Sequence, residues 1–189
     1  MMSKHIILIS AIAVVALGHG PNCFRKQDPG TDANCSNAPS QRYHHDSKTL
    51  QCVAFQYKGC RGNENNYESP KDCEDTCQVG MKSYVECPLR SAPIFNSKDR
   101  SDCPVSEPET GEGCESPDAY CRSFINLALC CKRTIVLGLR EDRSETCPSG
   151  KSRWMVDGAP VLAHSCDKVK CPNGYSCKAG NFFSYCCEN

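Results

Sequence analysis

The sequence has few aromatic residues and no excess of charge of either sign. Phe, Trp and Tyr make up 7% of the 189 residues, so one large hydrophobic core is not expected. Lys and Arg total 22, as do Asp and Glu, and no basic stripe stands out along the chain. This balance argues against nucleic acid or an anionic membrane surface as a partner.

Long apolar runs are also missing, except at the N-terminus. The segment Ile6–Leu17 is almost uninterrupted by polar residues, it follows the basic Lys4, and small residues stand at Gly18 and Gly20. A run this short is a poor membrane span and has the layout of a secretory signal. We therefore expect residues 1–20 to be a signal peptide, cleaved after Gly18 or Gly20. The remainder is predicted to be secreted and extracellular, without a membrane segment.

Catalytic and metal-binding motifs are absent too. The sequence contains no Gly-x-Ser-x-Gly, no His-Glu-x-x-His, no phosphate-binding loop and no Cys-x-x-Cys. His44-His45-Asp46 looks like a catalytic or metal-binding set, but adjacent histidines on a strand point to opposite sides and cannot easily share a ligand. We expect no enzyme activity, no cofactor and no metal site.

What the sequence does contain is cysteine, at 18 positions in three consecutive sets of six. So high a cysteine content in a secreted chain is typical of a disulfide scaffold, and the even count fits full pairing. Segments of this size bury too little apolar surface to fold unaided, so three small modules held by disulfides are expected. The first set, separated by 11, 16, 7, 12 and 3 residues, is Cys23, Cys35, Cys52, Cys60, Cys73 and Cys77.

The residues around the first set predict a β-hairpin and a short helix. Arg42–His45 leads into a polar turn, and the β-branched and aromatic run Cys52–Tyr57 follows it. Ser69-Pro70-Lys71-Asp72 has a capping Ser, a Pro at the first helical position and an acidic residue three after the cap. Cys73 and Cys77 share one face of this helix, so they can attach it to two different parts of the chain.

With these elements in place, the segment resembles the Kunitz family (bovine pancreatic trypsin inhibitor type). The resemblance covers about 55 residues, and the last three cysteine intervals equal those of the family. The matching residues are Arg42-Tyr43, Phe55, Tyr57, Gly59-Cys60, Gly62, Asn65-Asn66-Tyr67, Ser69, Cys73 and Cys77. The spacing alone leaves 15 pairings of six cysteines open. The resemblance implies Cys23–Cys77, Cys35–Cys60 and Cys52–Cys73, and a buried Asn65 whose amide satisfies backbone groups.

The resemblance also implies a function. In this family a loop held rigid by the Cys35–Cys60 disulfide enters the active site of a serine protease in a substrate-like shape. The predicted protease-binding loop comprises Asn34, Cys35, Ser36, Asn37, Ala38, Gly59 and Cys60. Family members that inhibit trypsin carry Lys or Arg after the loop cysteine.

This sequence departs from the family at that loop. The first cysteine interval is three residues longer than usual and the second is one longer. The specificity residue is therefore Ser36 when counted from Cys35, and Asn37 when counted back from Arg42. Neither is basic, so an elastase-like or chymotrypsin-like target is favoured over trypsin. Asn34-Cys35-Ser36 is also a formal glycosylation acceptor.

The second and third sets of cysteines form an internal repeat. Each begins with Cys-Pro, at Cys87 and Cys147, and each ends with adjacent cysteines, Cys130-Cys131 and Cys186-Cys187. Adjacent side chains on an extended chain point to opposite faces, so each cysteine of a pair is expected to bond a different partner. Asp157-Gly158 predicts a hairpin turn. The linker between the two sets contains Ile135-Val136-Leu137, which we interpret as a strand.

The third set resembles the lustrin-type cysteine-rich repeat found beside Kunitz domains in nematode secreted proteins, and the second set is a looser match. The predicted fold is small, disulfide-rich and α+β: a Kunitz domain (twisted β-hairpin plus C-terminal helix) at 21–78, then two small β-rich modules at 87–132 and 147–189. The predicted function is a secreted Kunitz-type serine protease inhibitor. One form of this hypothesis is that the inhibitory activity is weak or has been lost. The alternative is an extracellular matrix or cuticle protein that uses the Kunitz fold as a scaffold.

Overall fold

The computed structural model describes residues 21–78, 85–105 and 109–189, so the predicted signal peptide lies outside the described residues. Nine disulfides divide the described chain into three modules, each closed by its own three bonds. We name them by their outermost bond: the first module (Cys23–Cys77), the second (Cys87–Cys131) and the third (Cys147–Cys187). None of the helices in the described residues is long and apolar enough to span a membrane.

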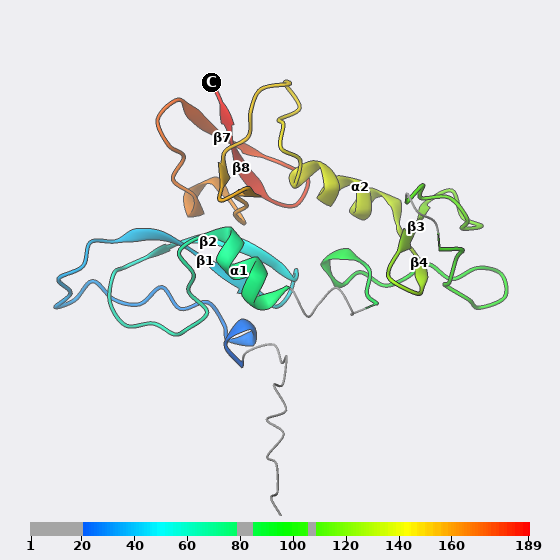
Figure 1. Ribbon diagram of the computed structural model, residues 1–189, viewed down its shortest axis with the longest axis horizontal. Coiled ribbons are helices and arrows are strands. Elements are labelled where there is room, and N and C mark those ends of the chain that lie inside the picture. The colour runs from blue at the N-terminus through cyan, green and yellow to red at the C-terminus, as the bar shows by residue number, and fades with distance from the viewer. Residues whose placement is uncertain (1–20, 79–84, 106–108) are drawn as a thin grey trace, which may run out of the picture.

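The first module consists of an antiparallel hairpin and a helix packed against it (Figure 1). A short 3-10 helix, η1 (Pro21–Phe24), precedes strands β1 (Ser40–Asp46) and β2 (Gln51–Tyr57), and helix α1 (Pro70–Cys77) follows them. The predicted helix start is confirmed: the Ser69 side chain accepts a hydrogen bond from the backbone N–H of Asp72 at 3.1 Å, and Pro70 occupies the first turn.

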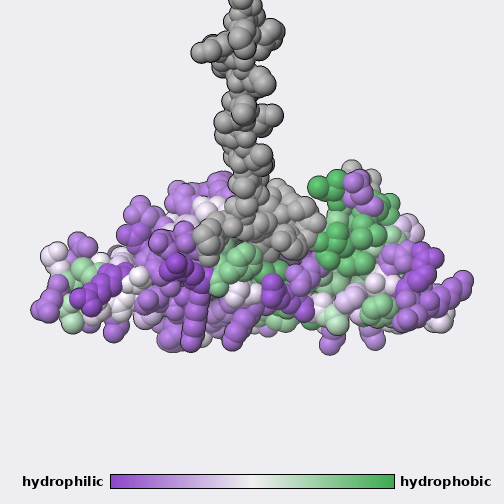
Figure 2. Space-filling model, turned by 90° about the horizontal axis from the view of Figure 1, so that it is seen from below, coloured by the Kyte–Doolittle hydropathy of each residue, from purple (hydrophilic) through white to green (hydrophobic). Residues whose placement is uncertain are grey.

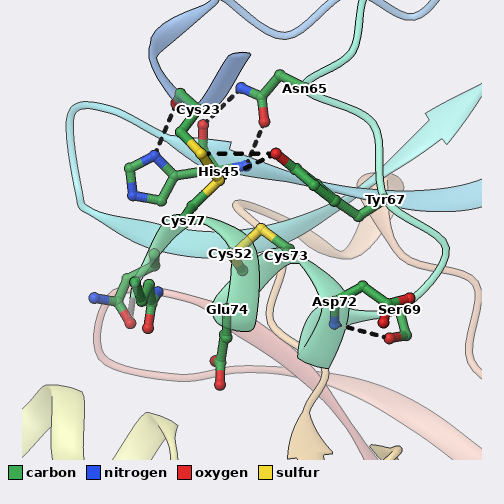
Figure 3. Close-up of a disulfide and its surroundings, with 12 residues drawn as sticks. Cys23, His45, Cys52, Asn65, Tyr67, Ser69, Asp72, Cys73, Glu74 and Cys77 are labelled. Carbon is green, nitrogen blue, oxygen red and sulfur yellow. Dashed lines mark hydrogen bonds between the residues drawn. A yellow bond between two sulfur atoms is a disulfide. The ribbon is translucent and has the colours of Figure 1, made fainter. Parts of the chain in front are cut away.

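Two disulfides attach α1 to the rest of the first module (Figure 3). Cys73 bonds Cys52 on β2, and Cys77 bonds Cys23 in η1, so the two cysteines of the helix do join different parts of the chain. Asn65 is buried, as the resemblance implies. Its side chain accepts from His45 N–H at 2.8 Å and donates to the carbonyls of His45 and Arg25 at 2.9 and 2.7 Å. These bonds satisfy backbone groups that would be costly to bury unpaired.

The second and third modules are each built around a disulfide-bonded hairpin. In the second, strands β3 (Ala119–Ser123) and β4 (Ala128–Lys132) follow the 3-10 helix η3 (Pro88–Arg90). In the third, the elements are β5 (Met155–Val156), β6 (Ala159–Pro160), the 3-10 helix η4 (Cys166–Lys168), β7 (Tyr175–Ala179) and β8 (Ser184–Glu188). Asp157 and Gly158, both at positive φ, connect β5 to β6, which confirms the predicted turn.

All three modules pair their cysteines in the same order, first with sixth, second with fourth and third with fifth. In the second module the bonds are Cys87–Cys131, Cys103–Cys121 and Cys114–Cys130. In the third they are Cys147–Cys187, Cys166–Cys177 and Cys171–Cys186. The adjacent cysteines on β4 and on β8 therefore bond different partners, as expected from their alternation along a strand.

The segment between the second and third modules is a helix, so the interpretation of Ile135-Val136-Leu137 as a strand is wrong. Helix α2 (Arg133–Asp142) buries Val136 and Leu139 on one side, at the spacing of a helix face. At its C-terminal end, the buried carboxylate of Asp142 accepts hydrogen bonds from the backbone N–H groups of Asn181, Phe182 and Phe183 at 2.7–3.0 Å. The helix is thereby fixed to the turn between β7 and β8.

The third module packs directly on the hairpin of the first module. The N–H of Ala54 on β2 donates to the carbonyl oxygen of Leu162 at 2.7 Å, and Ala163 pairs with Ser184 on β8. The segment 161–163 thus lies beside the edge of β2. Its side chains alternate in direction: Val161 and Ala163 pack in the cluster of Ala54, and Leu162 in that of Val53.

Polar contacts reinforce this packing between modules. Arg143, just after α2, donates to Glu74 on α1 and to Gln51 on β2 at 2.8 and 2.9 Å. The Nε2 atom of His164 lies 3.2 Å from a carboxylate oxygen of Asp46 at the end of β1. The Val53 cluster contains residues of all three modules and of α2: Val53, Leu89, Leu139, Leu162 and Phe183.

The surface differs between the two ends of the molecule. Figure 2 shows that the side of the first module is mostly hydrophilic, whereas green, hydrophobic surface gathers on the side of β3 and β4. There the turn between these strands exposes Ile125 by 73% and Leu127 by 39%.

The packing of the third module on β2 predicts the effect of shortening Leu162. Replacing this fully buried side chain in Leu162→Ala should lower the free energy of unfolding by about 2–5 kcal/mol, because a cavity opens between modules. The same change at Leu137, which is 42% exposed on α2, should cost less than about 0.5 kcal/mol. Urea unfolding measures both. Hydrogen exchange of the Ala54 amide should become faster only in Leu162→Ala, and equal exchange rates in the two variants would contradict the packing.

The buried His44 predicts a pH dependence of stability. Burial lowers the pKa of His44 to about 4 from 6.5, against an opposing effect of the nearby Asp46 carboxylate. Its Nδ1 atom has no hydrogen-bond partner among the described residues, and its ring packs edge-on against Phe55. Because the unfolded chain takes up the proton first, stability present above pH 6.5 is lost as the pH falls towards 4, by up to about 3 kcal/mol.

The variant His44→Phe should keep the contact with Phe55 and remove this loss. Thermal unfolding of wild type and variant between pH 7.5 and 4 measures the difference. The gap in stability between the two proteins should widen, in favour of the variant, as the pH falls. Parallel pH profiles would show that His44 does not carry the effect.

Candidate functional site

The predicted protease-binding loop lies at one end of the first module. It follows η1 and precedes β1, and its second segment, Gly59-Cys60, lies one residue after the end of β2. In Figure 1 this end, coloured blue, lies at the left, whereas β3 and β4 lie at the right and the third module lies above the hairpin. Ser36, Asn37 and Ala38 are exposed. The structure therefore leaves the loop accessible while the other modules pack elsewhere.

A disulfide and two short strand-like contacts hold the two segments of the loop together. Cys35 bonds Cys60, with 5.6 Å between their Cα atoms. Cys60 also exchanges backbone hydrogen bonds with Thr31, at 2.8 and 3.2 Å, and the N–H of Lys58 donates to the carbonyl oxygen of Pro29 at 2.8 Å. The segment before Cys35 is thus paired with the segment that follows β2, which restricts the loop from both sides.

Asn37 adds a bond across the loop that the sequence did not reveal. Its side-chain amide donates to the carbonyl oxygen of Gly59 at 3.2 Å. The two residues are 22 positions apart, so no local spacing indicates the contact. Asn37 is one of the two candidates for the specificity residue, and this bond ties its side chain to the other segment of the loop. Ser36, the other candidate, has no such bond across the loop.

Gly59 is required by this close approach. It has a φ of +108°, and a Cβ atom built there would lie 2.4 Å from the carbonyl oxygen of Asn37. A side chain would therefore push the two loop segments apart. Asn34 also has a positive φ, of 54°, a conformation that asparagine tolerates better than most residues, and its side chain is exposed.

The three side chains of His44-His45-Asp46 have different partners in the structure. His44 packs on Phe55, whereas Nδ1 of His45 lies 2.9 Å from the carbonyl oxygen of Cys23. Burial alone would raise the pKa of Asp46. Hydrogen bonds from His164, Thr49 and the Lys48 N–H outweigh this effect, so the pKa of Asp46 lies below its usual value. The three side chains thus serve packing and module contacts.

One group of sulfur atoms has the spacing of a metal cage but not its chemistry. The Sγ atoms of Cys103, Cys114 and Cys130 lie within 4.8 Å of one another. Each belongs to a disulfide, so none offers the thiolate that a metal ion requires. The cluster is two adjacent disulfides.

Part of the chain matches a known protein family, and longer stretches match individual proteins. The family described as "Kunitz/Bovine pancreatic trypsin inhibitor domain" matches residues 22–78. The chain is similar to the Major allergen Ani s 1 of Anisakis simplex, with 28% identity over 96% of this chain and 94% of the allergen. It is also similar to the BPTI/Kunitz inhibitor domain-containing protein C02F12.5 of Caenorhabditis elegans, with 25% identity over 82% and 83% of the two chains.

A third relative matches the first module alone. U-actitoxin-Avd3s of Anemonia viridis is 38% identical over 68 residues, which are 36% of this chain and 80% of the toxin. The two nematode relatives, by contrast, match well beyond the first module. Through the domain at residues 22–78, the chain belongs to the Kunitz/bovine pancreatic trypsin inhibitor family.

Proposed function

We propose that this chain is a secreted serine protease inhibitor whose loop Asn34–Ala38, with Gly59 and Cys60, occupies the active site of its target. The observation that carries the proposal is the exposed loop fastened by Cys35–Cys60 at the end of the molecule that the other modules leave open. A loop already held in its bound shape loses little conformational entropy on docking. Membership of an inhibitor family supports a role as inhibitor rather than enzyme.

The proposed target is an elastase-like or chymotrypsin-like protease. Ser36 and Asn37 carry no charge, so neither can pair with the aspartate at the floor of a trypsin-type pocket. The bond from Asn37 to Gly59 favours Ser36 as the residue that enters the pocket. A small hydroxymethyl side chain suits a small or unspecialised pocket.

Secretion and glycosylation belong to the same proposal. Nine disulfides are typical of proteins from oxidising compartments outside the cytosol, which supports residues 1–20 as a signal peptide and an extracellular location. Asn34 is exposed within the acceptor Asn34-Cys35-Ser36, although Cys35 is held in a disulfide. A glycan on Asn34 would stand on the binding loop and block docking.

For the second and third sets of cysteines we propose two modules of one type, at 87–132 and 147–189. Their shared order of disulfide pairing and their terminal hairpins support this. The likeness to lustrin-type repeats stays a prediction. In this proposal the third module stiffens the hairpin that presents the loop, because it covers the edge of β2.

A panel of purified serine proteases tests the proposal. The protein should slow at least one elastase-like or chymotrypsin-like enzyme stoichiometrically, and mass spectrometry of the reacted inhibitor should place the presented bond beside Ser36. The chain is compared with Asn34→Gln, which cannot be glycosylated at this site. Absence of inhibition by both proteins across the panel would remove the proposal.

Introducing a cation into the loop predicts a gain of function. In the Asn34→Gln background, Ser36→Lys should improve inhibition of trypsin by at least about 30-fold, because the new ammonium reaches the aspartate of the pocket. Asn37→Lys should improve it much less, because that side chain points into the loop. Asn173→Lys, an exposed position in the third module, controls for added charge. Titration against bovine trypsin measures all three, and equal behaviour of Ser36→Lys and Asn173→Lys would contradict the assignment of Ser36.

A further inference from the structure

A cavity lies where the first and second modules meet helix α2. Its volume is about 190 Å³, smaller than the ~300 Å³ at which pockets for drug-sized ligands begin, so it suits a small molecule. Three leucines from different parts of the fold form its apolar walls: Leu50 from the turn between β1 and β2, Leu89 from η3 and Leu139 from α2. Arg122 on β3 also lines the cavity.

Arg122 has no anionic partner in the described part of the chain. Its side chain makes no ion pair or hydrogen bond with a described residue, and its guanidinium lies 5.3 Å from the centre of the Phe124 ring. Burial lowers the pKa of Arg122, and the nearby Glu109 only partly opposes this. Because removing a cation from water is costly unless a counter-charge is supplied, such an arginine favours an anion beside it.

The acidic groups near Arg122 are occupied elsewhere. The Glu109 carboxylate accepts from Arg140 at 2.8 Å and from the N–H of Ser123 at 3.0 Å. Glu86, which also lines the cavity, lies 3.9 Å from Nε of Arg90. The cavity thus combines apolar walls with one cation whose charge no described residue neutralises directly.

Two of the leucines in the cavity wall have strained backbone conformations. Leu50 and Leu89 have φ values of +58° and +55°, a region that bulky residues rarely adopt. Residues in such conformations persist only where the surroundings hold them, and they cluster at binding sites. Here the strain places two leucine side chains at one small cavity.

We propose that this cavity binds a small organic carboxylate with a short apolar tail, its carboxylate on Arg122 and its tail against Leu50, Leu89 and Leu139. Arg122 offers the planar fork of donors that fits a carboxylate. The site is independent of protease inhibition, because it lies at the turn between β1 and β2. The loop Asn34–Ala38 lies at the opposite end of that hairpin, roughly 20 Å away for seven residues of strand.

Hexanoate is the probe, and backbone amide shifts of ¹⁵N-labelled protein in solution are the readout. Titration should give saturable shifts that centre on Leu50, Leu89 and Arg122. Methyl hexanoate, which keeps the tail and loses the charge, should bind at least about 10-fold more weakly, because a charge-assisted hydrogen bond is lost. N-acetyl-glycyl-leucine in a parallel titration distinguishes a peptide C-terminus from a free acid as the source of the carboxylate, and tighter binding of either one supports the proposal.

Variants separate Arg122 from the arginines around it. Arg122→Met should weaken hexanoate binding at least about 10-fold. Arg133→Met should leave it unchanged, because Arg133 lies over the Tyr120 ring in a similar way but does not line the cavity. Absence of saturable shifts, shifts centred elsewhere, or equal binding of hexanoate and its methyl ester would overturn the proposal. The comparison with the ester needs only the wild-type protein, so it decides the question even if Arg122→Met does not fold.

Discussion

Disulfide bonds are the constraint on which the rest of this structure depends. The first and second modules each contain one two-stranded sheet and the third contains two, with strands of two to seven residues. Modules of this size bury too little apolar surface to fold unaided, and each is closed by three disulfides worth roughly 2–4 kcal/mol apiece. The same order of pairing recurs in all three modules, although only the first has the Kunitz helix. The crosslinks also restrict the segment Asn34–Ala38, on which the proposed function rests.

Packing between modules then turns three small units into a larger one. The carbonyl oxygen of Leu162 accepts a hydrogen bond from the outward-facing N–H of Ala54. In the first module alone this N–H would face solvent. The clusters around Ala54 and Val53 draw side chains from beyond the first module, so the hairpin gains apolar contacts on both faces. These contacts leave the loop end of the hairpin open. The arrangement is consistent with a scaffold that supports the loop without covering it.

The sequence predicted local features better than contacts between distant segments. The helix start at Ser69, the turn at Asp157-Gly158 and the separate partners of adjacent cysteines follow from short-range rules, and the structure has all of them. The segment Ile135-Val136-Leu137 was wrongly predicted as a strand, because three β-branched or apolar residues fit a strand or a buried helix equally well. Other contacts join residues that are distant in the sequence, which no local pattern encodes. They include the packing of Leu162 against Val53, the bond from Asn37 to Gly59 and the position of Arg122 at a cavity.

Mapping the disulfides of the purified protein is the most direct test of the role given to these bonds. Proteolysis without reduction, followed by mass spectrometry of the linked peptides, should show Cys35 joined to Cys60 and no free thiol, with first-to-sixth, second-to-fourth and third-to-fifth pairing in every module. Cys35 joined to any other cysteine, or a free thiol at either position, would contradict the account, because the loop would no longer be held in a fixed shape.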